Sequence, residues 1–433
     1  MKVGLQTQKI SRNIRQLDSN FIEEYLTIYL NAYPAFKNID EEGRAHYRKE
    51  TLKSMNNEKN IHFIGLFEGE NLIATMKLID FSMNLFGEMQ PAVGLMSLAV
   101  HPLHKKKGAA LEMVRYFEKY TYDSGALVAL LLPFRMDFYR KMDYGFGSKL
   151  HEYCISTLQL PGASDISHLK ILNSEELPKI LECYSSFVKQ NHGMLEKFAE
   201  EVRNMELDTL TRRIGYMDGE NLKGYVAFRF VSDSSVNYTI NRMEVDELIY
   251  SDSNVLKELL GFLRLQADEA QTVVIRTGEE DFYHLLDNPQ DSSENYIPFG
   301  NLQTNISAVG IMHKIIDPEM FIRMTGYRSF PDEELTMKII YEDGMDHLSS
   351  SISLKFEKNS HVEGSKWTII PKDEKTDVVL ECKKSDLSSL FLGSCDLASM
   401  VRLGILQISD LAYLERLNRL FHCSKKPWTN TDF

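Results

Sequence analysis

The segment VHPLHKKKGAALEMV, residues 100–114, places three lysines and a glycine between an apolar stretch and a helical one. A helix N-terminus leaves backbone N–H groups unpaired and carries a partial positive charge. Lys105, Lys106 and Lys107 would strengthen that charge, and Gly108 would let the main chain approach a ligand closely. The spacing therefore favours a pyrophosphate site. The alternative is a solvated lysine run, because motif matches of this length also occur by chance.

The elements that would position these lysines alternate between helix and strand. Helical periodicity covers residues 19–32 and, less cleanly, 41–55. Strand patterns then precede the lysines, and a helix from about residue 109 to 122 follows them. The next elements are a buried-type strand, ALVALLLPF, a helix from near residue 136, and a final strand around 151–158. We expect these elements to form one unit.

The same order of elements returns after a linker candidate at residues 159–168, which is rich in small and polar residues. The turn MDGENLKGY echoes FEGENLIAT in the first unit, and a strand, loop, helix and strand follow in the same order. The second loop, however, has lost the lysines and the glycine. A third region begins within residues 287–305 and ends in a helix at about 409–421 and a twelve-residue tail.

Length and composition limit the possible functions. A chain of 433 residues is expected to form two or three domains. The net charge of -13 argues against a nucleic-acid surface and mildly favours a cationic or amine-bearing substrate. Five scattered cysteines without CxxC spacing indicate neither disulfides nor a metal site. With no apolar signal core and no membrane-length apolar run, we expect a cytoplasmic protein without a membrane partner.

Residues 105–110, KKKGAA, are similar to the R/Q-x-x-G-x-G/A pyrophosphate loop of the GNAT acetyltransferases, with lysine in the first position. Within that fold the chain resembles the Eis (enhanced intracellular survival) group of acetyl-CoA-dependent N-acetyltransferases, which acetylate several amines of aminoglycosides. The stretches that carry the resemblance are LAVHPLHKKKGAA, PFRMDFYRKMDYGFG, HGML, VGIMHKIID and KPWTNTDF. Together they extend over essentially the whole chain.

The resemblance implies an α+β class (α/β GNAT) with three domains. They are a catalytic GNAT domain over 1–158 that binds acetyl-CoA, a degenerate GNAT-like domain over 159–300 without cofactor, and a sterol-carrier-protein-like α/β domain over 301–433 whose tail enters the active site. It also implies a homo-hexamer. The degenerate repeat in the sequence agrees with this division.

The resemblance also assigns roles to individual residues. Tyr139 would be the general acid that protonates the leaving thiolate, and the terminal carboxylate of Phe433 would receive the amine proton. Independently of the resemblance, we expect Trp428 and Pro427 to prop the tail, because a tail that enters the active site has to be anchored. The expected cofactor contacts are Leu98, Ala99 and Val100 through free backbone groups, the loop and helix start at Lys105, Lys106, Lys107, Gly108, Ala109, Ala110 and Leu111, and Phe134 and Arg135 after the next strand.

For three further residues the sequence favours a structural role. We expect Tyr144, the local rival of Tyr139, to be structural. Asp143 stands where GNAT sequences usually have glycine, and we expect it to end a helix in a left-handed conformation. His192 could be a base or a packing residue, and the neighbouring glycine and methionine favour packing.

Three functions are compatible with the sequence. The first is acetylation of amines on aminoglycoside-like or other cationic acceptors by direct attack on acetyl-CoA. In the second, the acceptor is a peptide or protein lysine or a small metabolite amine. The third is a non-catalytic lipid-binding protein in which the GNAT cores are scaffolds, and Gly108 and Tyr139 count against it.

Overall fold

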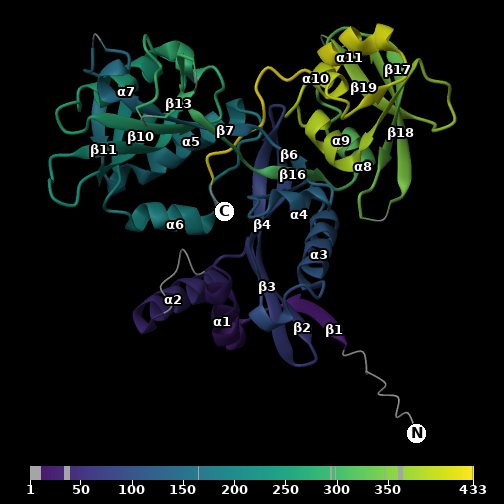
Figure 1. The fold of residues 1–433 in the computed structure, drawn as a ribbon, viewed down its shortest axis with the longest axis horizontal. Coiled ribbons are helices and arrows are strands. Elements are labelled where there is room, and N and C mark those ends of the chain that lie inside the picture. Colours follow the sequence, from purple (N-terminus) through teal and green to yellow (C-terminus); the bar gives the residue numbers. More distant parts are fainter. Residues whose placement is uncertain are drawn as a thin grey trace.

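The computed structural model describes residues 11–33, 40–163, 165–292, 295–297, 299–345, 347–358, 364–431 and 433. Ser164, inside the predicted linker, therefore lies outside the described residues. The strands of the described residues form two seven-stranded sheets, one five-stranded sheet and one two-stranded hairpin, with helices packed against them (Figure 1). The mixed α/β class predicted from the sequence is confirmed.

The first sheet has the strand order β1-β2-β3-β4-β5-β16-β6. Helices cover both faces of this sheet. Side chains on the two faces of its strands pack into two different core clusters. One cluster joins the sheet to α1, and the other joins it to α3. The bounds are β1 (Arg12–Gln16), α1 (Ile22–Ala32), α2 (Glu41–Asn57), β2 (Ile61–Glu68), β3 (Asn71–Leu85), β4 (Glu88–Val100), α3 (Ala109–Asp123), β5 (Val128–Leu131), α4 (Met136–Arg140), β6 (Gly145–Phe146) and β16 (Met312–Ile315).

Strands β4 and β5 separate at one end. Their parallel pairing ends where Leu95 faces Leu131, but β4 runs on to Val100. The β3–β4 register shifts in this extension, and Ser97 there has a φ of 56°. Such a bulge bends a strand, so the end of β4 turns away from β5 and a gap opens in front of α3.

The second sheet, ordered β15-β7-β12-β11-β10-β9-β8, repeats the first: a strand, two helices, three antiparallel strands, a helix and a parallel strand. The predicted internal repeat is thus present. The bounds are β7 (Lys149–Ser156), β8 (Leu169–Leu172), α5 (Leu177–Gln190), α6 (Ala199–Leu207), β9 (Arg212–Asp218), β10 (Asn221–Ser232), β11 (Asn241–Tyr250), α7 (Ser253–Arg264), β12 (Thr272–Thr277) and β15 (Ile306–Val309), with the hairpin β13 (Tyr296–Ile297) and β14 (Asn301–Leu302).

Two strands cross between the sheets, which corrects one sequence-based prediction. The strand that we expected at 151–158 to complete the first unit is β7, and it pairs with β12 and β15 of the second sheet. Its inward residues Tyr153 and Ile155 pack in the second core, which fixes this placement. In the first sheet, the free edge of β5 is covered instead by β16, with Met312 opposite Leu131.

The third sheet has the order β19-β18-β17-β20-β21, and its core includes a cluster of aromatic rings among aliphatic side chains. Trp367 lies 4.9 Å from Phe330 and 5.4 Å from Phe391, measured between ring centroids. These rings fill the space between sheet and helices. The bounds are α8 (Pro318–Met324), β17 (Leu335–Glu342), β18 (Ser349–Lys358), β19 (Ser365–Ile370), β20 (Val378–Lys383), α9 (Lys384–Phe391), α10 (Leu397–Arg402), β21 (Gln407–Ile408) and α11 (Leu414–Phe421).

The C-terminal tail joins the three parts of the chain. In Figure 1 it leaves the third sheet beside α10, passes along the second sheet and ends near β4 of the first. In the described part of the chain, no helix is long and apolar enough to cross a bilayer. Nor do the described residues include a group of three or more His, Cys, Asp or Glu side chains that could hold a metal ion.

Candidate functional site

A cavity of about 460 Å³ lies at the end of β4, in front of the N-terminus of α3. It brings together the end of α1, the end of β4, the lysine loop and α4. Its lining includes every cofactor contact predicted from the sequence except Lys107, together with Tyr139: Ala32, Tyr33, Leu98, Ala99, Val100, His104, Lys105, Lys106, Gly108, Ala109, Ala110, Leu111, Phe134, Arg135, Phe138 and Tyr139.

The start of α3 has the geometry of an anion site. Gly108 precedes the helix with a φ of 85°, a left-handed conformation that glycine adopts without strain. Having no side chain, it leaves the amides of Ala109, Ala110 and Leu111 uncapped, and these amides have no carbonyl partner within the helix. A Cβ at Gly108 would meet nothing closer than Glu112 Oε1 at 3.9 Å. This open, amide-lined end of the cavity fits a diphosphate.

Arg12 holds the lysine loop in place from β1. Its Nη1 donates to the Lys107 carbonyl at 3.1 Å and to the Glu112 carboxylate at 2.6 Å, while its Nε donates to Glu68 at 3.0 Å. Lys107 also turns its ammonium back onto the Leu103 carbonyl at 3.1 Å. Lys107 therefore stabilises the loop. The sequence predicts that Lys107 contacts the cofactor, but this residue does not line the cavity.

Tyr33 shapes the wall of the cavity at the end of β4. Its hydroxyl donates to the Leu98 carbonyl at 2.8 Å, so one of the two acceptor positions of this carbonyl, which we expected to be free for a ligand, is already taken. The side of Ala99 and Val100 that would face β5 stays open, because the β4–β5 pairing has already ended. Phe134, 80% exposed, lies at the mouth, 6.5 Å edge-on from Tyr33. The exposed Arg135 is paired with Asp137 at 2.5 Å.

Tyr139, on α4, lines the cavity. The residue is 7% exposed and packs edge-on against Phe138 and Tyr144, with ring centroids at 5.2 and 5.8 Å. Burial raises the pKa of the phenol to about 12, so it is protonated at neutral pH. Tyr144 is fully buried and stacks on Phe117, outside the cavity lining, in keeping with a structural role.

Phe433, at the chain end, is buried rather than frayed. It is 6% exposed and its ring lies 4.9 Å from that of Phe81. A Cβ added to Gly94 would lie 2.7 Å from the Phe433 ring. Gly94 precedes Leu95, which packs with Tyr139 on the other face of the sheet. The structure thus brings Phe433 to β4 at the point where β5 separates, but from the face opposite Tyr139.

A second hollow, of about 240 Å³, lies on the Phe433 face of the sheet. Met96, two residues beyond Gly94, lines it together with Tyr25 and Tyr29 of α1. Two carboxylates, Glu50 of α2 and Glu200 of α6, also line it. Glu200 is paired with Lys77 at 2.7 Å. Sequence reasoning missed this hollow, because no local pattern marks side chains contributed by three separate helices.

His192 joins the three parts of the chain through its ring. Its Nδ1 accepts from the Phe86 N–H at 3.2 Å, and its Nε2 donates to the Leu392 carbonyl at 2.9 Å. Phe86 also stacks on the ring at 4.2 Å and holds the Arg328 guanidinium at 3.9 Å. Burial lowers the pKa of His192 to about 4. Both ring nitrogens are engaged, so His192 packs and bonds, as the sequence favoured.

Asp143 adopts the left-handed conformation expected for it, with a φ of 67°. Its carboxylate accepts from the Gly344 N–H at 2.9 and 3.0 Å and so docks the third domain onto the first. Burial raises the pKa of this carboxyl to about 6. The departure from glycine thus supplies a contact between domains.

Comparisons with known families agree with this architecture. Residues 13–147 match an acetyltransferase (GNAT) domain, residues 193–303 match another acetyltransferase (GNAT) domain, and residues 318–430 match a sterol carrier protein domain. No curated protein matches the sequence. The two GNAT domains and the C-terminal sterol-carrier-protein-like domain predicted from the sequence are therefore confirmed.

Several solved structures share the fold over nearly the whole chain. A GCN5-related N-acetyltransferase from Kribbella flavida is 17% identical with a TM-score of 0.75, covering 98% of this chain and 99% of its own. One from Anabaena variabilis is 15% identical with a TM-score of 0.77, covering 98% and 100%. Eis1 from Mycobacterium abscessus is 17% identical with a TM-score of 0.73, covering 98% and 100%. The chain is an acyltransferase with two GNAT domains followed by a sterol carrier protein domain.

Proposed function

We propose that the chain is an acetyl-CoA-dependent N-acetyltransferase of the Eis type. The observation that carries this proposal is the cavity that joins the uncapped amides of α3 to the phenol of Tyr139. We divide the chain into a catalytic domain over 1–158, a second GNAT-like domain over 159–300 and a sterol-carrier-protein-like domain over 301–433. Two strands cross these boundaries, since β7 pairs into the second sheet and β16 into the first. By the resemblance to the Eis group we propose a homo-hexamer. From the sequence itself we propose a cytoplasmic protein without a nucleic-acid partner, in keeping with its net charge of -13.

Acetyl-CoA would lie along the end of β4. The amides of residues 109–111 would hold its diphosphate, and Lys105 and Lys106 would add positive charge. The open edge of Ala99 and Val100 would pair with the pantetheine arm. Since Tyr33 already donates to the Leu98 carbonyl, this carbonyl would offer the arm its one remaining acceptor position. Lys107 would act through Arg12 rather than by direct contact.

The acyl transfer would pass through the gap between β4 and β5. Acetyl-CoA would supply an activated acetyl group to the attacking amine, and Tyr139 would hold the phenolic proton that the departing thiolate takes. The amine loses its own proton to the Phe433 carboxylate. The two catalytic groups lie on opposite faces of the sheet, which matches a donor that enters from one face and an acceptor that enters from the other.

The acceptor would be a cationic amine of the aminoglycoside type. The hollow on the Phe433 face carries the rings of Tyr25 and Tyr29, and aromatic rings attract amines. Its two carboxylates are each paired with a cation that also lines the hollow: Glu50 lies 3.4 Å from Arg203, and Glu200 lies 2.7 Å from Lys77. The alternative acceptors are a peptide or protein lysine and a small metabolite amine. The lipid-carrier alternative is not favoured, because the third domain fills its centre with aromatic side chains such as Trp367 and Phe391.

The test is acetyl-CoA consumption with a panel of acceptors. We expect turnover with an aminoglycoside, and less with a lysine peptide or a monoamine of the same concentration. Preference for the peptide would favour the second acceptor class. Failure of the protein to bind CoA in calorimetry would contradict the proposal.

A further inference from the structure

The second GNAT domain keeps the strand arrangement that forms the cavity in the first. Strands β11 and β12 are parallel and pair only from Arg242–Val245 to Thr272–Ile275, after which β11 continues to Tyr250. In the first domain, β4 extends beyond its pairing with β5 in the same way. A cofactor-type cleft is therefore expected at the end of β11.

The phosphate end of this second cleft is closed by the chain itself. Asp252 precedes α7, and its carboxylate accepts from the amides of Asn254 at 2.9 Å and Val255 at 3.2 Å. These are the positions that Gly108 leaves open at α3. A diphosphate here would have to displace a carboxylate and would meet its negative charge, so the second cleft is unsuited to CoA.

The C-terminal tail lies in the rest of the second cleft. A hollow of about 350 Å³ there is lined by the end of α5, the end of β11 and the segment after β12, as in the first domain. Its remaining wall is Asp396 and the tail at 422–426, 428 and 430. Trp428 lies on Gly278, directly after β12: a Cβ at Gly278 would be 2.5 Å from the indole. The indole also packs edge-on against Phe187 at 6.4 Å.

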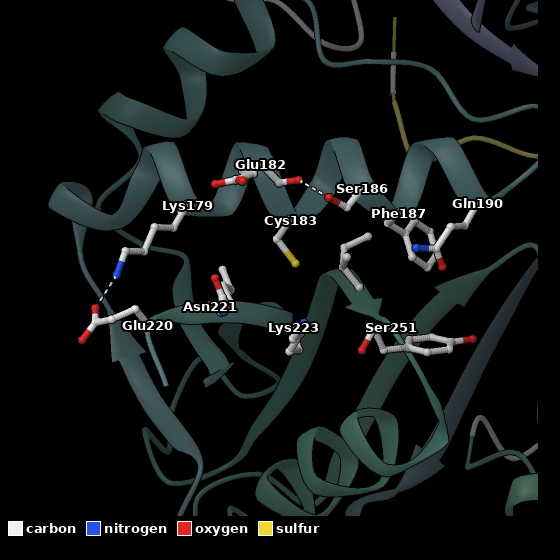
Figure 2. Close-up of a pocket in the computed structure, with 13 residues that line it drawn as sticks. Lys179, Glu182, Cys183, Ser186, Phe187, Gln190, Glu220, Asn221, Lys223 and Ser251 are labelled. Carbon is white, nitrogen blue, oxygen red and sulfur yellow. Dashed lines mark hydrogen bonds and ion pairs between the residues drawn. The ribbon is translucent and has the colours of Figure 1, made fainter. Parts of the chain in front are cut away.

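The adjoining hollow on the α5 side, of about 380 Å³, shares residues with this cleft. Figure 2 shows Phe187 and Gln190 at the end of α5 and Ser251 beyond β11, and all three line both hollows. Lys179 and Glu220 form an ion pair at its rim, 3.2 Å apart. Trp428 lines the 350 Å³ hollow at the end of β12 but not the 380 Å³ hollow on the α5 side.

Contacts on either side of Trp428 fix the course of the tail. Pro427 lies on Gly193, where a Cβ would be 2.5 Å from the Pro427 Cα, and its carbonyl accepts from the Ser148 hydroxyl. The Trp428 N–H donates to the His192 carbonyl at 3.4 Å. Further along, Thr431 lies 3.3 Å from the Tyr184 hydroxyl, measured between oxygens. The tail is thus held by both GNAT domains before it ends at β4.

We propose that the second GNAT domain is the anchor of the C-terminal tail. Its cofactor-type cleft takes Trp428, and the five residues that follow place the Phe433 carboxylate at β4. Trp428 is then a positioning residue: it touches neither acetyl-CoA nor the acceptor but sets where the carboxylate lies. This inference rests on the proposed role of Phe433, and it gives the second GNAT domain a task that does not involve CoA.

Two variants test the anchor. Gly278→Ala places a methyl group against the indole, and Trp428→Ala removes the ring. We expect both to increase amide hydrogen exchange over residues 424–433 and to lower kcat by about ten- to a hundredfold, since small misplacements of a reacting group are costly. The KM for acetyl-CoA should stay unchanged, because its cavity lies elsewhere. Trp428→Phe should restore most of kcat.

Gly162→Ala is the matched control, because a Cβ there meets nothing within 4 Å. It should change neither exchange nor kcat. Tail exchange that stays at the wild-type level in both Gly278→Ala and Trp428→Ala would overturn the anchor. Deletion of Phe433 separates the two proposals: if it leaves kcat unchanged, the carboxylate is not the base, whereas the exchange measurement still decides whether Trp428 anchors the tail.

Discussion

Replacing Tyr139 with phenylalanine removes one oxygen from the cavity and leaves the ring. The packing against Phe138 and Tyr144, at 5.2 and 5.8 Å, should persist, so we expect the free energy of unfolding to change by about 1 kcal/mol or less. Loss of a general acid typically lowers the rate by roughly 10²- to 10⁴-fold. This range corresponds to about 3 to 5 kcal/mol of transition-state stabilisation.

The assay is steady-state turnover of acetyl-CoA with a saturating acceptor, together with calorimetric binding of CoA. We expect Tyr139→Phe to lower kcat at least about a hundredfold while the Kd for CoA stays unchanged. Because the pKa of Tyr139 is raised to about 12, kcat of the wild type should show no alkaline loss from this group up to about pH 10.

Tyr144→Phe is the matched control, since Tyr144 is buried in the same core cluster but does not line the cavity. Its kcat should match the wild type. Equal rates for Tyr139→Phe and wild type, or an equal loss in Tyr144→Phe, would refute the assignment of the acid.

Three further predictions follow from the same geometry. Deletion of Phe433 should lower kcat by roughly 10²-fold with an unchanged KM for acetyl-CoA, and an unaltered kcat in steady-state assays would exclude the terminal carboxylate as the base. Lys105→Ala should weaken CoA binding more than Lys107→Ala, because Lys105 lines the cavity and Lys107 does not. Calorimetry at low salt compares the two variants, and equal losses of affinity would contradict this placement. The pKa of His192 is lowered from 6.5 to about 4 in the folded chain, so the unfolded chain binds more protons between these pH values. The free energy of unfolding should therefore fall by up to about 3 kcal/mol as the pH drops through that range. Denaturation of His192→Gln should show a flatter pH profile, and a profile as steep as that of the wild type would contradict this prediction.

The lysine loop and its glycine could be predicted because the signal is local. Gly108 and the first turn of α3 lie within a few residues of one another, and a left-handed glycine in front of a helix has a recognisable sequence pattern. The same holds for Asp143, whose left-handed conformation follows from its position at a helix end. Its partner Gly344 lies 201 residues away and could not be inferred.

The residues that sequence reasoning missed act over long separations. Arg12 reaches the Lys107 carbonyl across 95 residues, and Tyr33 reaches the Leu98 carbonyl across 65. Neither pair lies within one helix turn or one hairpin, so no periodicity connects them. The exchange of β7 and β16 between sheets was missed for a related reason. β7 lies between β15 and β12, and β16 lies between β5 and β6. The residue pattern of a strand does not tell which of two sheets it joins.

The central claim is that the start of α3 holds the diphosphate of acetyl-CoA with its thioester end near Tyr139. The most direct test is a crystal structure of the protein with CoA bound. In that structure we expect phosphate oxygens within hydrogen-bonding distance of the amides of residues 109–111, and a thiol end that faces the Tyr139 hydroxyl. A diphosphate bound elsewhere, or an empty cavity at saturating CoA, would contradict it.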